Sequence, residues 1–374
     1  MKITLDVTLL VNVGIAFIAA LVVCWVATPI VDKFAFSIGA VDDPNRDDRR
    51  MHTVPKSRIG GLAIFLGFVV SVVLFAELNR QVQSILIGLV IIVITGAIDD
   101  IIDLKWWIKG IAQLGAASIA VFWGGVVVER MSNPFALFSH SSAQFIELGI
   151  FAVPCTIIWI LAVTNSVNFI DGLDGLAVGV SGISSATMVV TALIVADGNS
   201  ALIMAALCGA CLGFMPFNMN PSKLFMGDSG ALTLGYVLAA MSVLGVFKFY
   251  AIVSFVVPFL ILAITIFDET FAVFRRLAKG MKPWDGDRGH LHHRLIDMGL
   301  TQKQAVAVCY WASAVLGLLA VVMTTDGGVK AFLLALVLLV AAVVAVKIFK
   351  KPHTDRDAAS APEKPDSADK PNEP

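Results

Sequence analysis

The stretch "ITGAIDDIIDL", residues 94–104, sets the end of a long apolar run against a group of carboxylates. The run stops at Asp99 and Asp100, and Asp103 follows three residues later. Charged side chains are costly inside a membrane, and they are kept there mainly for function. Carboxylates at the C-terminal end of a helix also oppose the helix dipole. The stretch therefore predicts a membrane-spanning helix whose acidic end serves a function.

The composition of the whole chain agrees with a membrane protein. Its 374 residues are 58% hydrophobic and only 15% charged, whereas soluble domains are about half apolar and a quarter charged. Apolar runs of about 18 residues, long enough to cross a bilayer as helices, recur along the chain. Only helices and closed barrels satisfy their backbone in lipid, and barrel-type alternation is absent. We therefore predict an all-α polytopic membrane protein.

The hydrophobic runs predict about eleven transmembrane helices. The first resembles a signal peptide but has a longer apolar stretch and no small-residue cleavage site, so we expect it to be retained. The expected spans are residues 8–30, 60–78, 82–98, 108–124, 146–164, 175–196, 199–216, 230–247, 251–271, 304–323 and 329–348.

The basic residues predict the orientation of these spans. Of the 27 Lys and Arg residues, 22 fall on alternate connections or at the C-terminal end, and cytoplasmic loops carry the excess of such residues. The N-terminus is therefore expected outside and the C-terminus in the cytoplasm. Within a membrane domain of residues 1–350, the expected cytoplasmic loops are 31–59, 99–109, 165–174, 217–229 and 272–303.

Two further features receive no role in chemistry. Residues 351–374 contain five prolines and almost nothing apolar, which predicts a disordered cytoplasmic tail. The five cysteines all fall inside apolar spans, where they are expected to be packing residues rather than a disulfide framework.

The loop "NSVNFIDGLDGLA", residues 165–177, carries the most regular polar pattern. Asn165 and Asn168 are three residues apart, as are Asp171 and Asp174, so each pair shares a helix face. Carboxylates and amide oxygens without a basic partner suit a hard cation such as Mg²⁺. The alternative is a polar turn rich in Asn, Asp and Gly.

Two other loops combine glycines with polar side chains. Arg58 precedes a glycine pair at residues 60–61, and such a pair allows close approach of the backbone to a phosphate. A Gly-Asp-Ser-Gly turn surrounds Asp228 at the start of an apolar run. Backbone N–H groups at such a helix start are expected to be free to bind an anion. Phe225 lies nearby and could stack on a base.

A histidine-rich segment, "HLHHRL" at residues 290–295, offers many hydrogen-bond donors. A zinc site is one interpretation, but Cys or acidic partners at ligand spacing are few. A cradle for phosphates, formed by His290, His292, His293 and Arg294, fits the donors better. Acids for Mg²⁺ and bases for phosphate on one membrane face predict phosphoryl transfer, in which catalysis is mostly positioning and charge neutralisation. An ion-coupled transporter is the alternative outside this class, and it would place paired acids near the bilayer midplane.

Together, these motifs resemble the polyprenyl-phosphate N-acetylhexosamine-1-phosphate transferase superfamily over roughly residues 10–325. The matching segments are "PKSRIGGLAIF", "GAIDD", "NSVNFIDGLDGLA", "KLFMGDSGALTLG" and "HLHHRL". The resemblance implies about ten or eleven helices and the transfer of a sugar 1-phosphate from a UDP-sugar to undecaprenyl phosphate. It also implies Mg²⁺, which Mn²⁺ could replace, and the release of UMP.

The resemblance also implies roles for individual residues on the metal side of the site. Asp228 would be the main Mg²⁺ ligand and Asn168 a second one. Asp99 and Asp100 match the paired acids assigned to the lipid phosphate or the metal. Lys109 is similar in position to a pyrophosphate-binding lysine.

On the nucleotide side, the resemblance implies that Asp171 and Asp174 are acids near the nucleotide. Asn218 and Phe225 would lie beside the uracil ring. The histidine segment matches the loop that recognises phosphate and sugar.

The histidine segment also separates the subfamilies. It is similar to the bacterial branch that uses UDP-GlcNAc to begin teichoic acid, O-antigen or common-antigen synthesis. The phospho-MurNAc-pentapeptide transferase of peptidoglycan synthesis is the alternative within the superfamily. The expected location is the bacterial plasma membrane with the active site facing the cytoplasm. The expected partners are UDP-GlcNAc, undecaprenyl phosphate and the lipid bilayer, not nucleic acid; a homodimer is left open.

Overall fold

A computed structural model describes most of the chain and divides it into two units. The units are Met1–Gly328 and Val329–Pro374, and the described residues all belong to the first. The eleventh expected span and the C-terminal tail lie outside the described part, so both stay predictions. The structure describes residues 6–42, 54–132, 145–246, 259, 262–278 and 291–324.

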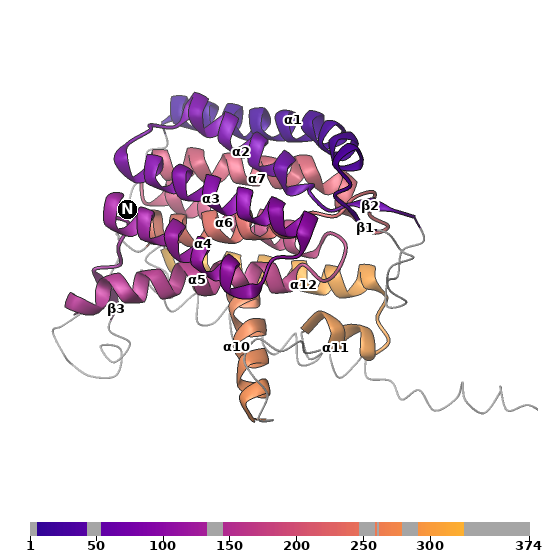
Figure 1. Cartoon of the computed structure of the whole chain (residues 1–374). Helices are drawn as coiled ribbons and strands as arrows, with labels where there is room; N and C mark the ends of the chain where they lie inside the picture. The colour runs from indigo at the N-terminus through magenta and orange to yellow at the C-terminus, as the bar shows by residue number, and fades with distance from the viewer. Residues whose placement is uncertain are drawn as a thin grey trace, which may run out of the picture. The chain divides into compact units, whose positions relative to one another are not determined.

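The described chain is built from helices with two short antiparallel strand pairs (Figure 1). The first six long helices are α1 (Val7–Ile38), α2 (Gly61–Phe75), α3 (Arg80–Ile102), α4 (Trp106–Ser118), α5 (Ala152–Ile170) and α6 (Leu176–Ile194). The remaining helices are α7 (Gly198–Asn218), α8 (Gly227–Met241), α10 (Ala263–Ala278), α11 (Leu291–Asp297) and α12 (Gln302–Thr324). Short π-helical or 3₁₀ segments extend three of them, namely η2 (Ile119–Trp123), η4 (Gly149–Phe151) and η5 (Ser242–Val246). The strand pairs are β1 (Val41–Asp42) with β2 (Lys56–Ser57), and β3 (Arg130–Ser132) with β4 (Phe145–Glu147).

Seven helices of the described part are long and apolar enough to cross a membrane, and α2 is a shorter apolar helix. The protein is therefore a multi-pass helical membrane protein, although the described part does not reach the expected count of eleven spans. The seven helices are α1, α3, α5 with η4, α6, α7, α8 with the start of η5, and α12. Each overlaps one of the predicted spans.

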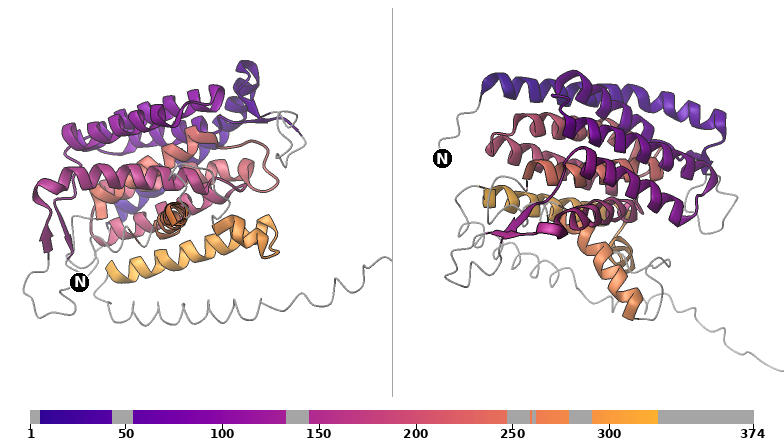
Figure 2. Two further views of the ribbon diagram at one scale, coloured as in Figure 1. Left: turned by 60° about the horizontal axis from the view of Figure 1, so that its bottom comes forward. Right: turned by 60° about the vertical axis from the view of Figure 1, so that its left-hand side comes forward.

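The helix described at the ninth expected span, residues 251–271, ends later than predicted. Helix α10 runs from Ala263 to Ala278 and carries Arg275 and Arg276 in its last turn. Both arginines were expected in a loop. Helix α10 is amphipathic, and in Figures 1 and 2 it leaves the bundle at a steep angle to the other helices. The apolar pattern correctly indicated a helix, but hydrophobicity alone could not show where it ends.

Helix α8 is the centre of the bundle. Every residue from Ser229 to Met241 is buried, and α2, α3, α5, α6 and α7 all contact this helix. On one side α1 packs on α2 and α7, and on the other α12 packs on α6 (Figure 2). The buried start of α8 therefore has a position that its neighbours determine.

Glycines allow two helices to approach the start of α8 closely. A Cβ on Gly96 of α3 would lie 2.5 Å from Cα of Ser229, and one on Gly61 of α2 would lie 2.0 Å from N of Gly230. Small residues allow such backbone contacts between membrane helices. Gly61 therefore serves helix packing. The expectation that the glycine pair at 60–61 approaches a phosphate stays a prediction.

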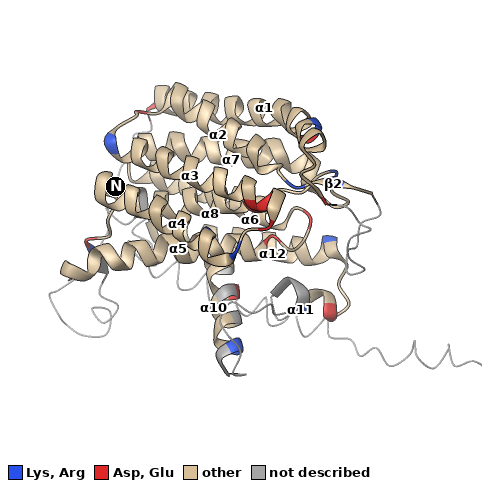
Figure 3. Ribbon diagram, in the orientation of Figure 1, with Lys and Arg blue, Asp and Glu red and all other residues tan. Residues whose placement is uncertain are grey.

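The polar loops meet at one end of the bundle. The ends of α3, α5 and α7 and the starts of α4, α6 and α8 supply them, and acidic residues gather there in Figure 3. The β1–β2 pair lies at the same end, because Phe225 donates its backbone N–H to the Ser57 carbonyl, 2.9 Å away. Four of the five expected active-site loops thus come together. Which side of the membrane this end faces stays a prediction.

The substitution Gly96→Ala tests the close contact between α3 and α8. Its new methyl group would press on the backbone of Ser229, and overpacking of this kind costs about 1–3 kcal/mol. We expect a lower midpoint of thermal unfolding in detergent. Gly115→Ala in α4 is the matched control, because nothing lies within 4 Å of its added Cβ and alanine favours the helix. An unchanged midpoint for Gly96→Ala would contradict this packing.

Candidate active site

A cavity of about 290 Å³ opens where the polar loops meet. Its walls come from the loop before α2, the last turn of α3, the end of α5 with the loop to α6, the end of α7, and the loop before α8 with its first turn. The lining residues are Arg58, Asp100, Asn168, Asp171, Gly172, Leu173, Asp174, Asn218, Phe225, Met226, Gly227 and Asp228. Eight of the fourteen site residues expected from the sequence are among them. Asp99 and Lys109 contact the wall at Asp228.

Asp100 caps the start of α8 from a different helix. Its Oδ1 accepts the backbone N–H of Asp228 at 2.8 Å, and its Oδ2 accepts that of Ser229 at 3.0 Å. The residue that precedes α8, Met226, forms no side-chain cap. A carboxylate at the positive end of a helix dipole is stabilising. Asp100 therefore lies at the unfavourable end of α3 but at the favourable end of α8.

This contact corrects the expectation for the Gly-Asp-Ser-Gly turn. The N–H groups of Asp228 and Ser229 were expected to be free for an anion, but Asp100 accepts both. Gly227 makes the approach feasible, because its φ is +70° and a Cβ there would lie 2.6 Å from the Asp100 carboxylate. The N–H groups of this turn thus bind a carboxylate of the protein itself, that of Asp100.

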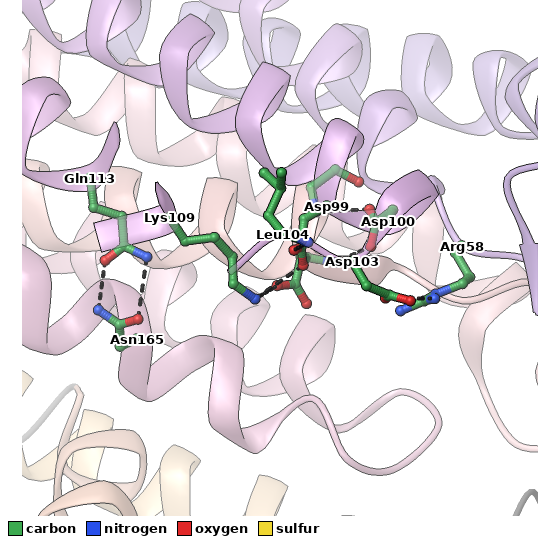
Figure 4. A network of polar contacts seen from close by, with 10 residues as sticks. Arg58, Asp99, Asp100, Asp103, Leu104, Lys109, Gln113 and Asn165 are labelled. Atoms are coloured by element: carbon green, nitrogen blue, oxygen red, sulfur yellow. Dashed lines mark hydrogen bonds and ion pairs between the residues drawn. The ribbon is translucent and has the colours of Figure 1, made fainter. Parts of the chain in front are cut away.

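Asp99 closes the turn from α3 to α4 and faces a lysine. Its Oδ1 accepts the backbone N–H of Leu104 at 2.7 Å, while its Oδ2 lies 3.0 Å from Nζ of Lys109 (Figure 4). The same Nζ lies 2.9 Å from Oδ2 of Asp228. The side-chain amide of Asn168 also hydrogen-bonds to Asp228. The expected catalytic and metal-binding residues therefore form one connected group.

The donor set in this group fits a magnesium ion. Among the residues that the structure describes, no three His, Cys, Asp or Glu side chains form a ready-made cluster of ligands. Mg²⁺ does not need one, because it is usually held by one or two carboxylates together with substrate phosphates and water. Asp99 and Asp228 direct carboxylate oxygens at a common cation, the Lys109 ammonium. Asp228, Asp99 and Asn168 are thus the residues that would hold the ion.

Asp174 and Asn218 connect two loops of the cavity. Asp174 accepts hydrogen bonds from N and Oγ of Ser222, at 3.1 and 2.8 Å, and from the amide of Asn220 at 3.0 Å. Asn218 accepts the N–H of Gly175 at 3.1 Å and donates to the Leu224 carbonyl at 3.2 Å. Both residues line the cavity, which is compatible with the expected nucleotide contacts. Those contacts stay a prediction. Their observed contacts hold the loops before α6 and α8 together.

Helix α12 also contacts these loops through two side chains. The sequence alone did not indicate these contacts. Gln302 accepts a hydrogen bond of 2.7 Å from Asn220, and the Tyr310 hydroxyl donates to the Gly175 carbonyl at 2.5 Å. Neither residue belongs to a recognisable motif. Asn220 lies within a predicted loop, but no pattern distinguishes it from an ordinary turn residue.

Arg58 and Phe225 also line the cavity. Arg58 is partly exposed, and its guanidinium lies 3.4 Å from the Asp103 carboxylate. The Phe225 ring carries the Lys56 ammonium at 4.8 Å from its centre, within cation–π range. The expected roles in phosphate and base recognition are compatible with these positions but are not tested by them.

The histidine segment is described only in part. His290 lies outside the described residues, and for His292 and His293 only the backbone in α11 is described. Arg294 is exposed and is not among the residues that line the cavity. The proposed phosphate cradle therefore stays a prediction.

Asp171, just beyond α5, has a raised pKa. Loss of hydration in the cavity wall, together with the nearby carboxylates of Asp228 and Asp174, raises the pKa of its carboxyl to about 7. A site that accumulates acids in this way is typical of function rather than of stability. The repulsion is relieved when a cation binds.

These features define a class: a multi-pass membrane transferase with an acidic and basic cavity at one end of its helical bundle. The family described as Glycosyl transferase family 4 matches residues 82–246. A probable undecaprenyl-phosphate N-acetylglucosaminyl 1-phosphate transferase of Bacillus subtilis is 38% identical over 84% of this chain and 86% of its own length. The chain belongs to this family of membrane glycosyl-1-phosphate transferases.

Two further relatives have names of the same class of transferase. A decaprenyl-phosphate N-acetylglucosaminephosphotransferase of Mycobacterium tuberculosis is 30% identical over 80% of this chain and 79% of its own length. An undecaprenyl-phosphate alpha-N-acetylglucosaminyl 1-phosphate transferase of Yersinia pestis is 29% identical over 78% and 79%. The resemblance found from the motifs is thereby confirmed, and the protein is an enzyme of this class.

The substitution Asp100→Asn tests the cap on α8. Asparagine keeps one acceptor oxygen but turns an N–H₂ group toward a backbone N–H, so a charged hydrogen bond worth about 1.5–3 kcal/mol is lost. We expect a lower midpoint of thermal unfolding, even without metal or substrate. Asp103→Asn is the matched control, because this neighbouring side chain is 81% exposed. Equal midpoints for the two variants would contradict the cap.

The stability of the metal-free protein should fall with pH because of Asp171. Its pKa is raised from an ordinary value near 3.8 to about 7 in the folded protein. Between these values the folded state binds more protons than the unfolded state, so stability decreases as pH rises. In EDTA, Asp171→Asn should unfold at a higher temperature than the wild type at pH 8, and this gain should shrink toward pH 5. A gain that grows toward acid pH would contradict the raised pKa.

Proposed function

We propose that this enzyme transfers N-acetylglucosamine 1-phosphate from UDP-GlcNAc to undecaprenyl phosphate. The products would be undecaprenyl-diphospho-N-acetylglucosamine and UMP. The observation that carries the proposal is the group of Asp99, Lys109 and Asp228 at the cavity wall, at the end of membrane-spanning helices. A phosphate on a membrane lipid and a water-soluble nucleotide could meet at such a place. The names of the relatives support undecaprenyl phosphate as the acceptor and N-acetylglucosamine 1-phosphate as the transferred group.

The residues of the cavity suit the charges of these substrates. Arg58 and Lys109 supply positive charge for the diphosphate of the nucleotide sugar, and cations are the main requirement in phosphoryl transfer. Asp99, Asp228 and Asn168 would hold Mg²⁺. When bound, the ion would neutralise phosphate charge and polarise the phosphorus under attack.

In the proposed reaction, one oxygen of the lipid phosphate attacks the phosphorus that carries the sugar. The bond from that phosphorus to the oxygen shared with UMP breaks, and UMP leaves with the electron pair. A phosphate monoester has a second pKa of about 6, so the lipid phosphate is mostly a dianion at neutral pH. It needs little help from a general base, which favours positioning as the main task of the aspartates. The contacts of Asp100 with α8 agree with that task.

The reaction would take place at the cytoplasmic face of the bacterial plasma membrane. The excess of Lys and Arg in the loops of this end supports that side. The first membrane step of a cell-envelope polysaccharide or teichoic acid is the process that such a product would serve. A phospho-MurNAc-pentapeptide transferase and an ion-coupled transporter are not favoured, because the relatives are named as N-acetylglucosamine phosphate transferases.

Release of UMP tests the function directly. Purified protein in nanodiscs would receive undecaprenyl phosphate, Mg²⁺ and one of UDP-GlcNAc, UDP-GalNAc or UDP-MurNAc-pentapeptide. We expect UMP and a lipid diphosphosugar, identified by mass spectrometry, with UDP-GlcNAc. Omission of the lipid phosphate should abolish turnover. Addition of EDTA should also abolish it, and excess Mn²⁺ should then restore turnover in the EDTA-treated sample. Turnover with UDP-MurNAc-pentapeptide alone, or full activity in EDTA, would refute the proposal.

A further inference from the structure

The ammonium group of Lys109 lies where the carboxylates of the site converge. Its Nζ is 3.0 Å from Oδ2 of Asp99 and 2.9 Å from Oδ2 of Asp228 (Figure 4). A magnesium ion bound to the same two oxygens would lie about 2.0–2.1 Å from each. The ammonium and the ion would then compete for one position. Entry of the metal therefore requires the lysine side chain to leave.

The carboxylates themselves are held firmly. Asp99 accepts the backbone N–H of Leu104 with its second oxygen, and the backbone N–H groups of Asp228 and Ser229 are fixed by Asp100. The backbone of α4 is also fixed close to Lys109. One turn further on, Gln113 and Asn165 of α5 exchange two amide hydrogen bonds of 3.2 and 2.6 Å (Figure 4).

The lysine side chain is consequently the part that can move. Its four methylene groups let a compact charge move by several ångströms without movement of the helix. Asp228 and Arg58 both line the cavity, so an ammonium that leaves Asp228 has the cavity within reach. A nucleoside diphosphate in that cavity would offer phosphate oxygens in place of the lost carboxylates.

From this geometry we propose that Lys109 is the resident counter-ion of the metal site. In the metal-free enzyme it neutralises Asp99 and Asp228; when the divalent ion enters, it moves to the phosphates of the nucleotide. The proposal rests on the Mg²⁺-dependent function proposed above. It adds that binding of the metal and binding of the nucleotide are coupled. The ion alone must displace an ammonium that gains no new partner, whereas the ion together with a diphosphate provides one. Metal and nucleotide should therefore bind cooperatively through this side chain.

Binding of Mn²⁺, followed through the electron paramagnetic resonance signal of the free ion, tests the displacement without turnover. The measurement uses the full-length protein in detergent, with and without UDP. Lys109→Gln should bind Mn²⁺ alone about tenfold more tightly than the wild type, since no ammonium competes. UDP should tighten Mn²⁺ binding less in this variant than in the wild type.

Two further variants control for charge. Lys105→Gln removes the same charge from an exposed position at the start of α4, and its affinity for Mn²⁺ alone should stay within about twofold of the wild type. Lys109→Arg keeps the charge and should bind Mn²⁺ no more tightly than the wild type. Equal or weaker Mn²⁺ binding by Lys109→Gln, or no Mn²⁺ binding by any variant, would overturn the proposal.

A measurement on the unaltered protein covers the case in which Lys109→Gln does not fold. Acetic anhydride labels free lysine amines, and mass spectrometry compares Lys109 with Lys105. Saturating Mn²⁺ should accelerate labelling of Lys109 relative to Lys105, and UDP should slow it again; no acceleration by Mn²⁺ would overturn the proposal. Because neither experiment involves turnover, a protein that shows the exchange but releases no UMP would refute only the proposed function.

Discussion

The contact between the Asp100 carboxylate and the first N–H groups of α8 is the constraint on which the site depends. It joins the last turn of α3 to the start of α8, and the residue that precedes α8 forms no side-chain cap of its own. Because α8 is buried on all sides, an uncapped start would leave polar groups without water or protein partners, which is costly. The cap also fixes Asp228, which follows the first residue of α8. The position of the proposed metal ligand is thus set by the same interaction that completes the fold.

Around this cap, the protein concentrates acids that do not favour its own stability. Loss of hydration and the nearby carboxylates of Asp228 and Asp174 raise the pKa of Asp171, and Asp99 pairs with the same Lys109 ammonium as Asp228. Lys109 offsets part of the repulsion among these carboxylates, and the loop contacts of Asp174 and Asn218 hold the walls in place. The structure therefore provides a rigid frame of helices and loops, within which one long basic side chain can change partners. Such a frame suits a reaction that depends on positioning and on neutralising phosphate charge.

Much of this organisation could be predicted from the sequence. The apolar runs indicated a multi-pass helical protein, and the placement of "GAIDD", "NSVNFIDGLDGLA" and "KLFMGDSGALTLG" at the ends of those runs indicated one common polar end. Two details were wrong. The N–H groups of Asp228 and Ser229 are accepted by Asp100, a contact with a distant segment that local pattern does not encode. Helix α10 extends beyond the span expected there, because hydrophobicity alone does not show where a helix ends.

The sequence by itself determined which chemical groups are present and that they lie at the ends of apolar helices, because hydrophobic length sets the ends of the helices. It also determined the family, since several modest motifs occur together in one order. Only the tertiary structure decided the division of labour within the Asp99–Asp100 pair. Successive residues of a helix point about 100° apart, so one carboxylate faces Lys109 and the other faces α8. Which neighbour each one meets depends on how the helices pack, and that packing is fixed by glycine contacts between segments far apart in the chain.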